Sequence, residues 1–448
     1  MSFESIKSVW KMTTLFVLVL VFQSVLCFYM VYMVDIWKIR YALSGQRDNC
    51  ETQPTRRTVQ TLPTESVSFP AKSANRTDNS QVSAVCSSLI AGDASEMNRS
   101  VDYMQRHPRR HLMPEAYPDY TKNCSAFVKQ AGFITKAASK EEEDFPIAFS
   151  IMVYKHAEQV ERLLRAIYRP YNVYCVHVDK KSPDVFMDAM KSIARCLPNV
   201  FIAPISLDVQ WGEYTVLEAD LICMDSLLQR KVLWKYFINL TGQEFPLKTN
   251  YELVQILKRY RGANDIAGGY KGTYKYRWKD IEHVPYGIIP KKGPVHITAS
   301  RGFVEHIRRN KKALDFLEWV KGTDVPDETY FASMNYNPHL KIPGTYKGDV
   351  SHHRPAWFTR LKIWEDWAKP CFGKFVHHIC IFGVGDLPRL TTIPHLFANK
   401  FHYDFQPLVL DCLQEWYFKK VEAEQNGRLQ FDTSMYKRKL FYFDKRAW

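Results

Sequence analysis

The feature that most constrains the fold is a strand–helix–strand unit between residues 147 and 179. Residues 147–153 and 173–178 are short, largely apolar runs, which predicts two buried strands. Between them, residues 156–168 place apolar side chains at helical spacing. A helix that joins two buried strands is typical of a parallel sheet, so the chain is predicted to be an α/β protein.

Asp179 directly follows the second of these strands, and Lys180, Lys181, Ser182 and Pro183 continue as a loop. In an open α/β sheet, ligands bind beyond the carboxyl ends of the strands. A carboxylate at that position can accept hydrogen bonds from a ribose or a uracil. The alternative is that Asp179 only starts a turn.

The α/β order continues along the chain, without repeats, Gly-x-Gly-x-x-Gly or a Walker sequence. A long loop rich in Gly, Tyr and Lys is predicted at residues 262–295. The further predicted elements are helices at 184–195, 214–228, 251–260 and 303–320 and strands at 200–203 and 234–240.

An uncharged, almost wholly apolar stretch near the N-terminus is long enough to span a bilayer once. A cleaved signal peptide is the alternative, but the stretch is long for one and no small-x-small cleavage site is clear. We predict an uncleaved signal anchor at 12–34 behind a short tail at 1–11, followed by a polar, flexible stem at 35–85.

Cysteines and glycosylation sequons point to an oxidising, secretory compartment. The chain has 10 cysteines, none of them in a Cys-x-x-Cys pair, so a zinc site is not expected. Pairing does not follow from sequence alone. Asn-x-Ser/Thr acceptors stand at Asn75, Asn98, Asn123 and Asn239.

The net charge of +14 favours anionic partners such as a nucleotide sugar, anionic lipid or nucleic acid. Nucleic acid is not expected, because the sequence holds no zinc-finger spacing, RNA-recognition signature or basic helix with heptads. The charge is scattered, so the alternative is that it only confers solubility.

Several motifs together carry a resemblance to a known family. They are RLLRAIY at 162–168, YCVHVD at 174–179, EADLIC at 218–223, WKYFINL at 234–240, FPLKTN at 245–250, PDE at 326–328, ICIFGVGDL at 379–387 and LFANKF at 396–401. In this order and spacing they resemble the core 2 and I-branching β-1,6-N-acetylglucosaminyltransferases. The resemblance covers residues 86–415, the predicted glycosyltransferase domain, and leaves 416–448 as a C-terminal tail.

The resemblance implies a single-pass type II Golgi membrane protein with a GT-A-like fold and its catalytic domain in the lumen. It implies inverting transfer of N-acetylglucosamine from UDP-GlcNAc to a 6-hydroxyl of a galactosyl/GalNAc acceptor on O-glycans of glycoproteins. Members of this family need no metal. The sequence contains no Asp-x-Asp, the motif with which most GT-A enzymes hold a divalent ion.

Inversion requires a base for the acceptor hydroxyl and a cation for the departing diphosphate. By the resemblance, Glu328 of the Pro-Asp-Glu turn is the base, and Lys400 binds the diphosphate. The alternative is that Asp327 caps a helix and Glu328 lies in its first turn. The family's diphosphate arginine falls on His377, a departure from the pattern. A histidine, with an ordinary pKa of about 6.5, carries a charge that depends on pH.

The same resemblance implies which further residues bind the donor and the acceptor. Trp211 falls where the family has a tyrosine near the donor, and it could equally be a core aromatic. The acceptor loop matches the family poorly, and Trp357 and Trp364 could equally pack in the core. The predicted donor-binding residues are Met152, Val153, Tyr154, Asp179, Lys180, Lys181, Trp211, His377 and Lys400, and the predicted acceptor-binding residues are Arg277, Trp357 and Trp364.

The family's disulfides also transfer onto this sequence. Cys50 in the stem is left over and could link two chains into a homodimer. The implied bridges are Cys86–Cys412, Cys124–Cys196, Cys175–Cys223 and Cys371–Cys380.

Two other functions remain open at this point. A xylosyltransferase is a relative of the family and would use a different donor. A Golgi glycan-binding protein without catalysis is favoured by His377 and the altered acceptor loop. Asp179, Glu328 and Lys400 are retained, which opposes loss of catalysis.

Overall fold

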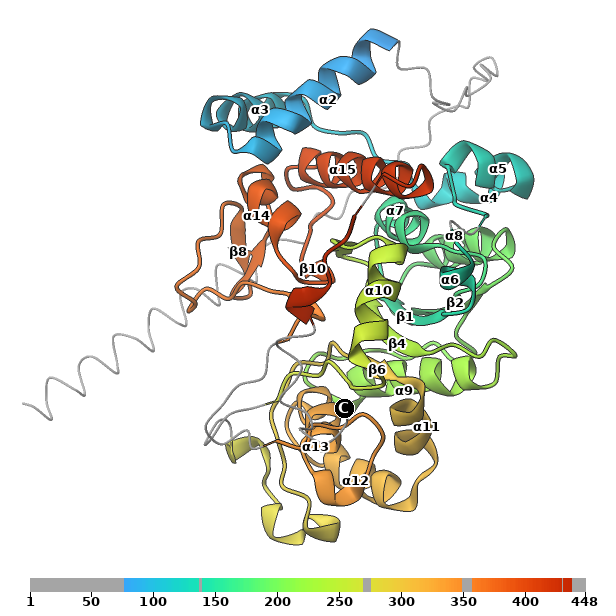
Figure 1. Ribbon diagram of the computed structural model, residues 1–448, viewed down its shortest axis with the longest axis vertical. Helices are drawn as coiled ribbons and strands as arrows, with labels where there is room; N and C mark the ends of the chain where they lie inside the picture. The colour runs from blue at the N-terminus through green and yellow to red at the C-terminus, as the bar shows by residue number, and fades with distance from the viewer. Residues whose placement is uncertain (1–75, 137–138, 269–274, 349–356, 429, 437–448) are drawn as a thin grey trace, which may run out of the picture. The chain divides into compact units, whose positions relative to one another are not determined.

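The computed structural model describes residues 76–136, 139–268, 275–348, 357–428 and 430–436. A five-stranded sheet has the order β3-β2-β1-β4-β6 (Figure 1). β1 pairs in parallel with β2 and β4, β2 pairs in parallel with β3, and only β6 is antiparallel. The predicted mostly parallel α/β sheet is therefore confirmed. Its strands are β1 (Ile147–Val153), β2 (Val173–Val178), β3 (Val200–Ile202), β4 (Tyr236–Thr241) and β6 (Thr298–Ser300).

Helices cover both faces of this sheet because successive strand residues point to opposite sides. Phe149 and Ile151 of β1 pack into one core, whereas Ala148, which directly precedes Phe149, packs into another. The helices on the first core are α7 (Ala157–Ile167), α8 (Asp184–Arg195) and α10 (Asn250–Tyr260). Those on the second core are α9 (Tyr214–Leu228), α11 (Arg301–Arg309), α12 (Lys311–Lys321) and α13 (Tyr330–Asn335).

The helix predicted at 303–320 is two helices, and Asn310 is the reason. Its backbone is extended, with φ −80° and ψ 131°, and its side chain accepts a hydrogen bond from the backbone N–H of Lys312. Asparagine favours such a cap because its side chain competes with the helical hydrogen bonds. The apolar spacing that predicted one helix continues across the break.

A second, three-stranded sheet has the order β5-β10-β7, and its central strand carries Ala398 and Asn399 and ends just before Lys400. β10 runs antiparallel to β5 and parallel to β7. A two-stranded hairpin, β8–β9, lies beyond Leu361 in sequence. The strands are β5 (Glu244–Pro246), β7 (Arg360–Leu361), β8 (Lys374–Val376), β9 (Ile379–Ile381) and β10 (Phe397–Asn399).

Short helices fill the connections, and the long loop predicted at 262–295 contains three single turns. The α-helices among them are α3 (Ala94–Arg106), α4 (Tyr117–Tyr120), α5 (Cys124–Ala131), α6 (Lys140–Glu143) and α14 (Leu387–Thr392). The 3-10 turns are η1 (Pro114–Ala116), η2 (Lys275–Arg277), η3 (Ile281–His283), η4 (Pro285–Gly287), η5 (Pro326–Glu328), η6 (Pro338–Leu340) and η7 (Val384–Asp386).

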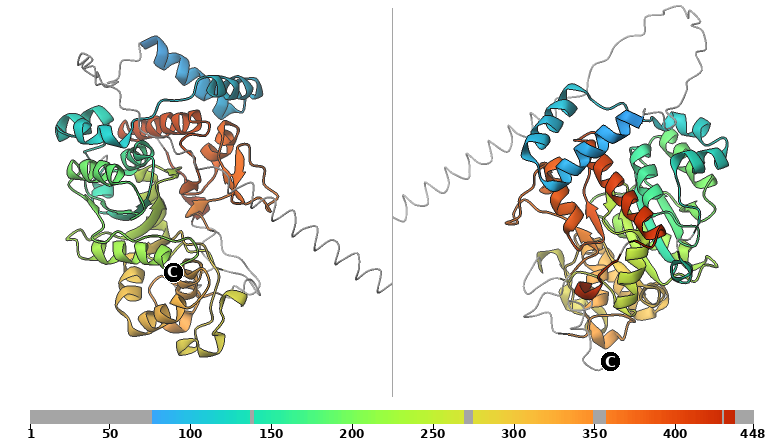
Figure 2. Two further views of the ribbon diagram at one scale, coloured as in Figure 1. Left: turned by 180° about the vertical axis from the view of Figure 1, so that it is seen from behind. Right: turned by 45° about the horizontal axis from the view of Figure 1, so that its top comes forward.

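The first and last long helices of the described chain pack together. The disulfide Cys86–Cys412 joins α2 (Arg76–Ala91) to α15 (Leu408–Gln425), which lie side by side in Figures 1 and 2. Tyr417 and Val421 of α15 are buried in the same core as Cys86. The packed domain is therefore longer at both ends than the predicted 86–415, because α2 begins before Cys86 and α15 continues past residue 415.

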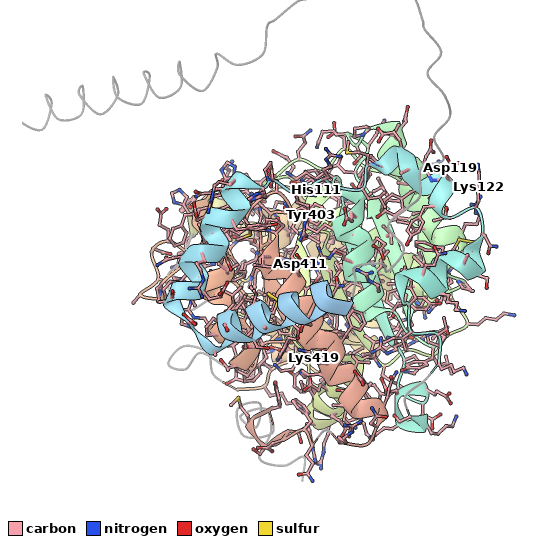
Figure 3. All side chains as sticks on the ribbon, turned by 90° about the horizontal axis from the view of Figure 1, so that it is seen from above. His111, Asp119, Lys122, Tyr403, Asp411 and Lys419 are labelled. Atoms are coloured by element: carbon pink, nitrogen blue, oxygen red, sulfur yellow. A yellow bond between two sulfur atoms is a disulfide. The ribbon has the colours of Figure 1, made fainter. Side chains whose placement is uncertain are left out.

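Charged groups fasten α15 to the rest of the domain (Figure 3). The Asp411 carboxylate is ion-paired with both Arg109 and Arg162. Near the other end of the helix, the Lys419 ammonium donates to the Ser83 hydroxyl at 2.9 Å. These contacts bring segments from both ends of the chain onto one helix.

The four disulfides are the pairs that the resemblance implies: Cys86–Cys412, Cys124–Cys196, Cys175–Cys223 and Cys371–Cys380. Cys50 and the apolar stretch 12–34 lie outside the described residues. Among the helices that the structure does describe, none has the length and apolarity needed to cross a membrane.

Candidate active site

The carboxyl ends of β1 and β2 bring the predicted nucleoside-binding residues together. The backbone N–H of Asp179 donates to the Val153 carbonyl at 2.9 Å, so the two strand ends are adjacent. Tyr154 is exposed, and its carbonyl accepts a hydrogen bond from the Ser182 hydroxyl at 3.0 Å. Met152 pairs in register with His177 just before this point. The site thus lies where a parallel sheet ordinarily binds ligands.

Asp179 does start a turn, but it keeps a partly exposed carboxylate. Its Oδ1 accepts from the backbone N–H of Lys181 at 2.8 Å, while the Lys181 ammonium lies 3.6 Å from Oδ2. The same ammonium pairs with Asp208 at 2.7 Å. Lys180 is exposed beside them. The turn and the ligand-binding interpretation are therefore compatible at this residue.

Glu328, the predicted base, is clamped through one of its two oxygens. The Arg277 guanidinium donates to Oε2 at 2.5 Å, and the Lys292 ammonium lies 3.7 Å from the same oxygen. Within the described part of the chain, Oε1 has no hydrogen bond or ion pair. The side chain is 20 % exposed. One oxygen is thus held by cations while the other is available to accept a proton.

Asp327 differs sharply from its neighbour. It is buried, and its Oδ1 has no hydrogen-bond partner in the structure. Burial, followed by the charge of Glu328, raises the pKa of Asp327 to about 7. The alternative in which Asp327 caps a helix is wrong, because neither η5 nor α13 has a side-chain cap.

Cations gather around Lys400, directly after β10. Burial, and then the charge of Lys155, lower the pKa of the half-buried Lys400. Burial, then Lys400 and Lys155, lower the pKa of His402 to about 4, and Lys374 acts in the same direction. Like charges depress each other's protonation when they are close. This cationic cluster, Lys155, Lys374 and Lys400, lies around a neutral His402 and is suited to bind an anion.

His377 is the residue at the family's arginine position. It is exposed in the turn between β8 and β9, at φ 49°. Three other cations stand near His377 in the sequence: Lys374, His378 and Arg389. His378 is paired with Glu365 at 2.7 Å, and Arg389 donates to the Pro370 carbonyl at 2.6 Å. Of these three, Lys374 belongs to the cationic cluster.

The predicted tryptophans occupy different environments. Trp211 is 88 % exposed, so the alternative of a core aromatic is wrong. Its neighbour Gly212 accepts a hydrogen bond from Val325 at 3.1 Å, which puts this turn beside the segment that carries Glu328. Trp364 is half-buried, with the Lys362 ammonium 5.9 Å from its ring centre. Trp357 is half-buried, and no hydrogen bond joins its indole N–H to the described residues.

Sequence reasoning missed a buried charged cluster behind Lys400. Glu244 of β5 accepts hydrogen bonds from His296 at 2.8 Å and from Asn399 at 3.0 Å. Arg360 of β7 lies 3.0 Å from its other oxygen, and neither residue is exposed. Burial acts to raise the pKa of Glu244, but Arg360 and His296 outweigh it and hold the pKa at about 2. The sequence did hold an indication of this cluster, because Glu244 and Arg360 are charged residues within short, otherwise apolar segments.

One sequon is contradicted by its environment. Asn239 of β4 is buried, and its Nδ2 donates to Asp220 at 2.6 Å and to the Val295 carbonyl at 2.9 Å. A glycan on that nitrogen is incompatible with these bonds. Asn98 and Asn123, in contrast, are exposed.

Ligand-type side chains beyond the carboxyl ends of parallel strands, next to a clamped carboxylate and a cationic cluster, define an α/β protein of the nucleotide-binding class. The chain belongs to the Core-2/I-Branching enzyme family, whose model matches residues 147–391.

Named relatives are similar over most of their length. A human beta-1,3-galactosyl-O-glycosyl-glycoprotein beta-1,6-N-acetylglucosaminyltransferase 3 is 37 % identical over 74 % of this chain and 82 % of its own. A second human beta-1,3-galactosyl-O-glycosyl-glycoprotein beta-1,6-N-acetylglucosaminyltransferase is 36 % identical over 74 % of this chain and 84 % of its own. The protein of that name from bovine herpesvirus 4 is 37 % identical over 74 % of this chain and 81 % of its own.

Proposed function

We propose that this protein transfers N-acetylglucosamine from UDP-GlcNAc, with inversion, to a 6-hydroxyl of a galactosyl/GalNAc acceptor on O-glycans. The observation that carries the proposal is Glu328, held by Arg277 and Lys292 through one oxygen with the other oxygen available. Relatives named for β-1,6-N-acetylglucosaminyl transfer support it.

The chemistry then distributes over these side chains. The free oxygen of Glu328 takes the proton of the acceptor hydroxyl as that oxygen attacks the anomeric carbon. Lys400 and Lys155 balance the charge on the departing diphosphate. Tyr154 and Asp179 hold the nucleoside at the strand ends. Arg277, which donates to Glu328, lies on the acceptor side of the site.

The closing experiment for this function is a transfer assay on the purified protein. Galactosyl-GalNAc and core 3 acceptors are offered with UDP-GlcNAc or UDP-xylose, and linkage is read by mass spectrometry and NMR. We expect a β-1,6-linked N-acetylglucosamine. Transfer of xylose would favour the xylosyltransferase, and glycan binding without transfer from either donor would favour the binding protein.

We also propose a type II Golgi membrane protein, anchored by residues 12–34 with the domain in the lumen. The apolar stretch and the family membership support this proposal. Cys50 would then lie in the lumenal stem and could link two chains. Gel migration of wild type and Cys50→Ser without reductant distinguishes a linked dimer from a monomer.

Activity is expected to survive metal chelation. The reason is that Lys400 and its cationic neighbours would supply the positive charge that a divalent ion otherwise supplies to the diphosphate, and no Asp-x-Asp is present in the sequence. Transfer rates are compared before and after dialysis against EDTA. Complete loss that Mn²⁺ restores would contradict metal-independent transfer.

His377→Arg is expected to tighten UDP binding and to flatten its pH dependence. A protonated imidazole attracts phosphate, and this attraction is lost as the pH rises and the ring loses its proton. A guanidinium keeps its charge and offers a planar fork to two phosphate oxygens. Calorimetric titrations of UDP from pH 5.5 to 8 test this, and superimposable profiles for the two proteins would remove His377 from the donor site.

A further inference from the structure

Lys362 is a charged residue beside the site that the proposed chemistry does not use. It directly follows β7, in which Arg360 pairs with Phe397 and Leu361 with Ala398. Continuing this register sets Lys362 beside Asn399, the residue before Lys400. Alternation along the strand puts Lys362 on the same face as Arg360. Lys362 is therefore at the end of the second sheet, next to the cationic cluster.

The Lys362 ammonium interacts with charged groups on every side. Burial, and then Arg360 and Lys400, lower its pKa, whereas Glu244 and Glu328 act to raise it; the result is about 8. It therefore remains largely protonated at neutral pH. The titratable and charged groups that face it are Glu244, His296, Asp327, Glu328, Arg360 and Lys400.

No group among the described residues holds the Lys362 ammonium in place. Across the described residues it has no hydrogen bond and no ion pair within 4 Å, and its one close partner is the Trp364 ring at 5.9 Å. A half-buried charge without hydrogen bonds is costly to fold. By contrast, the ammonium of the buried Lys248 donates to the Ile393 carbonyl at 2.9 Å. The free ammonium of Lys362 is thus available to an anionic ligand.

We propose that Lys362, together with Lys400, binds the diphosphate of the nucleotide-sugar donor. The inference rests on the proposed function and adds a diphosphate-binding residue to it. As transfer proceeds, the bond from the anomeric carbon to the β-phosphate oxygen breaks, and its electron pair stays on that oxygen. The acceptor O6 bonds to the same carbon, and its proton passes to Glu328. Lys362 stabilises the charge that develops on the leaving phosphate.

This assignment explains how the site tolerates a histidine at the family's arginine position. His377 is exposed in the hairpin turn between β8 and β9, whereas Lys362 is half-buried at the end of β7. The Lys362 ammonium also interacts electrostatically with both Glu328, the proposed base, and Lys400, which binds the leaving diphosphate. Among the described cations whose pKa is shifted, it is the one that interacts with both of these residues.

The test is calorimetric titration of UDP and UMP into wild type, Lys362→Met and Lys362→Arg. UDP affinity is expected to fall about 10- to 100-fold in Lys362→Met, the scale of a lost hydrogen bond to a charged group. UMP affinity should change much less, since UMP lacks the β-phosphate. Lys362→Arg keeps the charge and should restore part of the loss.

The pH profile gives a readout that a structural role would not move. Wild-type UDP affinity should weaken as the pH rises through about 8, where free Lys362 loses its proton. Lys362→Met should lack this decline. Lys248→Met is the matched control, because it removes a buried ammonium with a pKa also lowered to about 8 but away from the site; its UDP affinity should equal that of wild type.

The outcomes separate this inference from the function beneath it. If the wild-type protein binds neither UDP nor UDP-GlcNAc, UDP-GlcNAc is not the donor, and the role of Lys362 is rejected as well. Wild-type binding that Lys362→Met retains unchanged overturns the role of Lys362 alone. Should Lys362→Met fail to fold, the wild-type profile decides, because UDP affinity that stays constant from pH 7 to 9 overturns the proposal.

Discussion

Glu328→Gln is expected to lower kcat by at least about 10²-fold while the fold and UDP binding persist. Glutamine is nearly isosteric and still accepts the hydrogen bond from Arg277, but its amide cannot take the acceptor proton. The structure makes this substitution informative because Arg277 and Lys292 hold one oxygen and leave the other available. Steady-state kinetics with saturating donor measure kcat, and calorimetry measures UDP affinity.

The matched control is Glu318→Gln, which changes an exposed glutamate on α12 that pairs with Lys321 at 2.8 Å. Its kcat should equal that of wild type. Normal turnover by Glu328→Gln would assign the base to another residue, and loss of both turnover and UDP binding would indicate misfolding.

Arg360→Met is expected to destabilise the domain by about 3–5 kcal/mol, the cost of leaving a buried charge without its partner. Arg360 and Glu244 are fully buried 3.0 Å apart, and the guanidinium also donates to the Asn239 carbonyl at 2.5 Å. Methionine fills similar space but offers neither charge nor donor. Urea denaturation followed by circular dichroism measures the free energy of unfolding.

The pH dependence identifies the cause. The pKa of Glu244 is lowered to about 2 in the folded protein, so its ionised form contributes stability above the ordinary pKa of about 4.5. That contribution is lost as the pH falls from about 4.5 toward 2. Without Arg360, burial favours the neutral acid, so the deficit of Arg360→Met should shrink as the pH is lowered from 7 to 4.

Two variants complete this test. Adding Glu244→Gln to Arg360→Met should recover part of the lost stability, because the unpaired charge is gone. Lys311→Met breaks the exposed pair with Asp315 on α12 and should leave the urea midpoint unchanged. Equal stabilities of wild type and Arg360→Met at pH 7 would contradict the proposed role of the buried pair.

Much of the fold could be predicted because the information is local. Apolar spacing along residues 147–178 defined two strands and a helix, and the structure contains β1, α7 and β2 there. The bounds of α8 and α9 agree with the predicted 184–195 and 214–228. The motifs, taken together, also identified the family, and the four disulfides follow its pattern.

The sequence by itself therefore determined the α/β class, the family and the candidate base, since periodicity and motifs are properties of neighbouring residues. Only the tertiary structure decided which polar residues are buried and what they face. Asn239 stands in a glycosylation sequon but is buried in a central strand. Nothing in the sequence around Lys362 distinguishes it from a surface lysine, but in the structure it faces Glu244, Glu328, Arg360 and Lys400. Glu244 meets Arg360 because β10 aligns β5 and β7. Burial and charge pairing depend on segments that are distant in sequence, and these set the pKa values and the free energies.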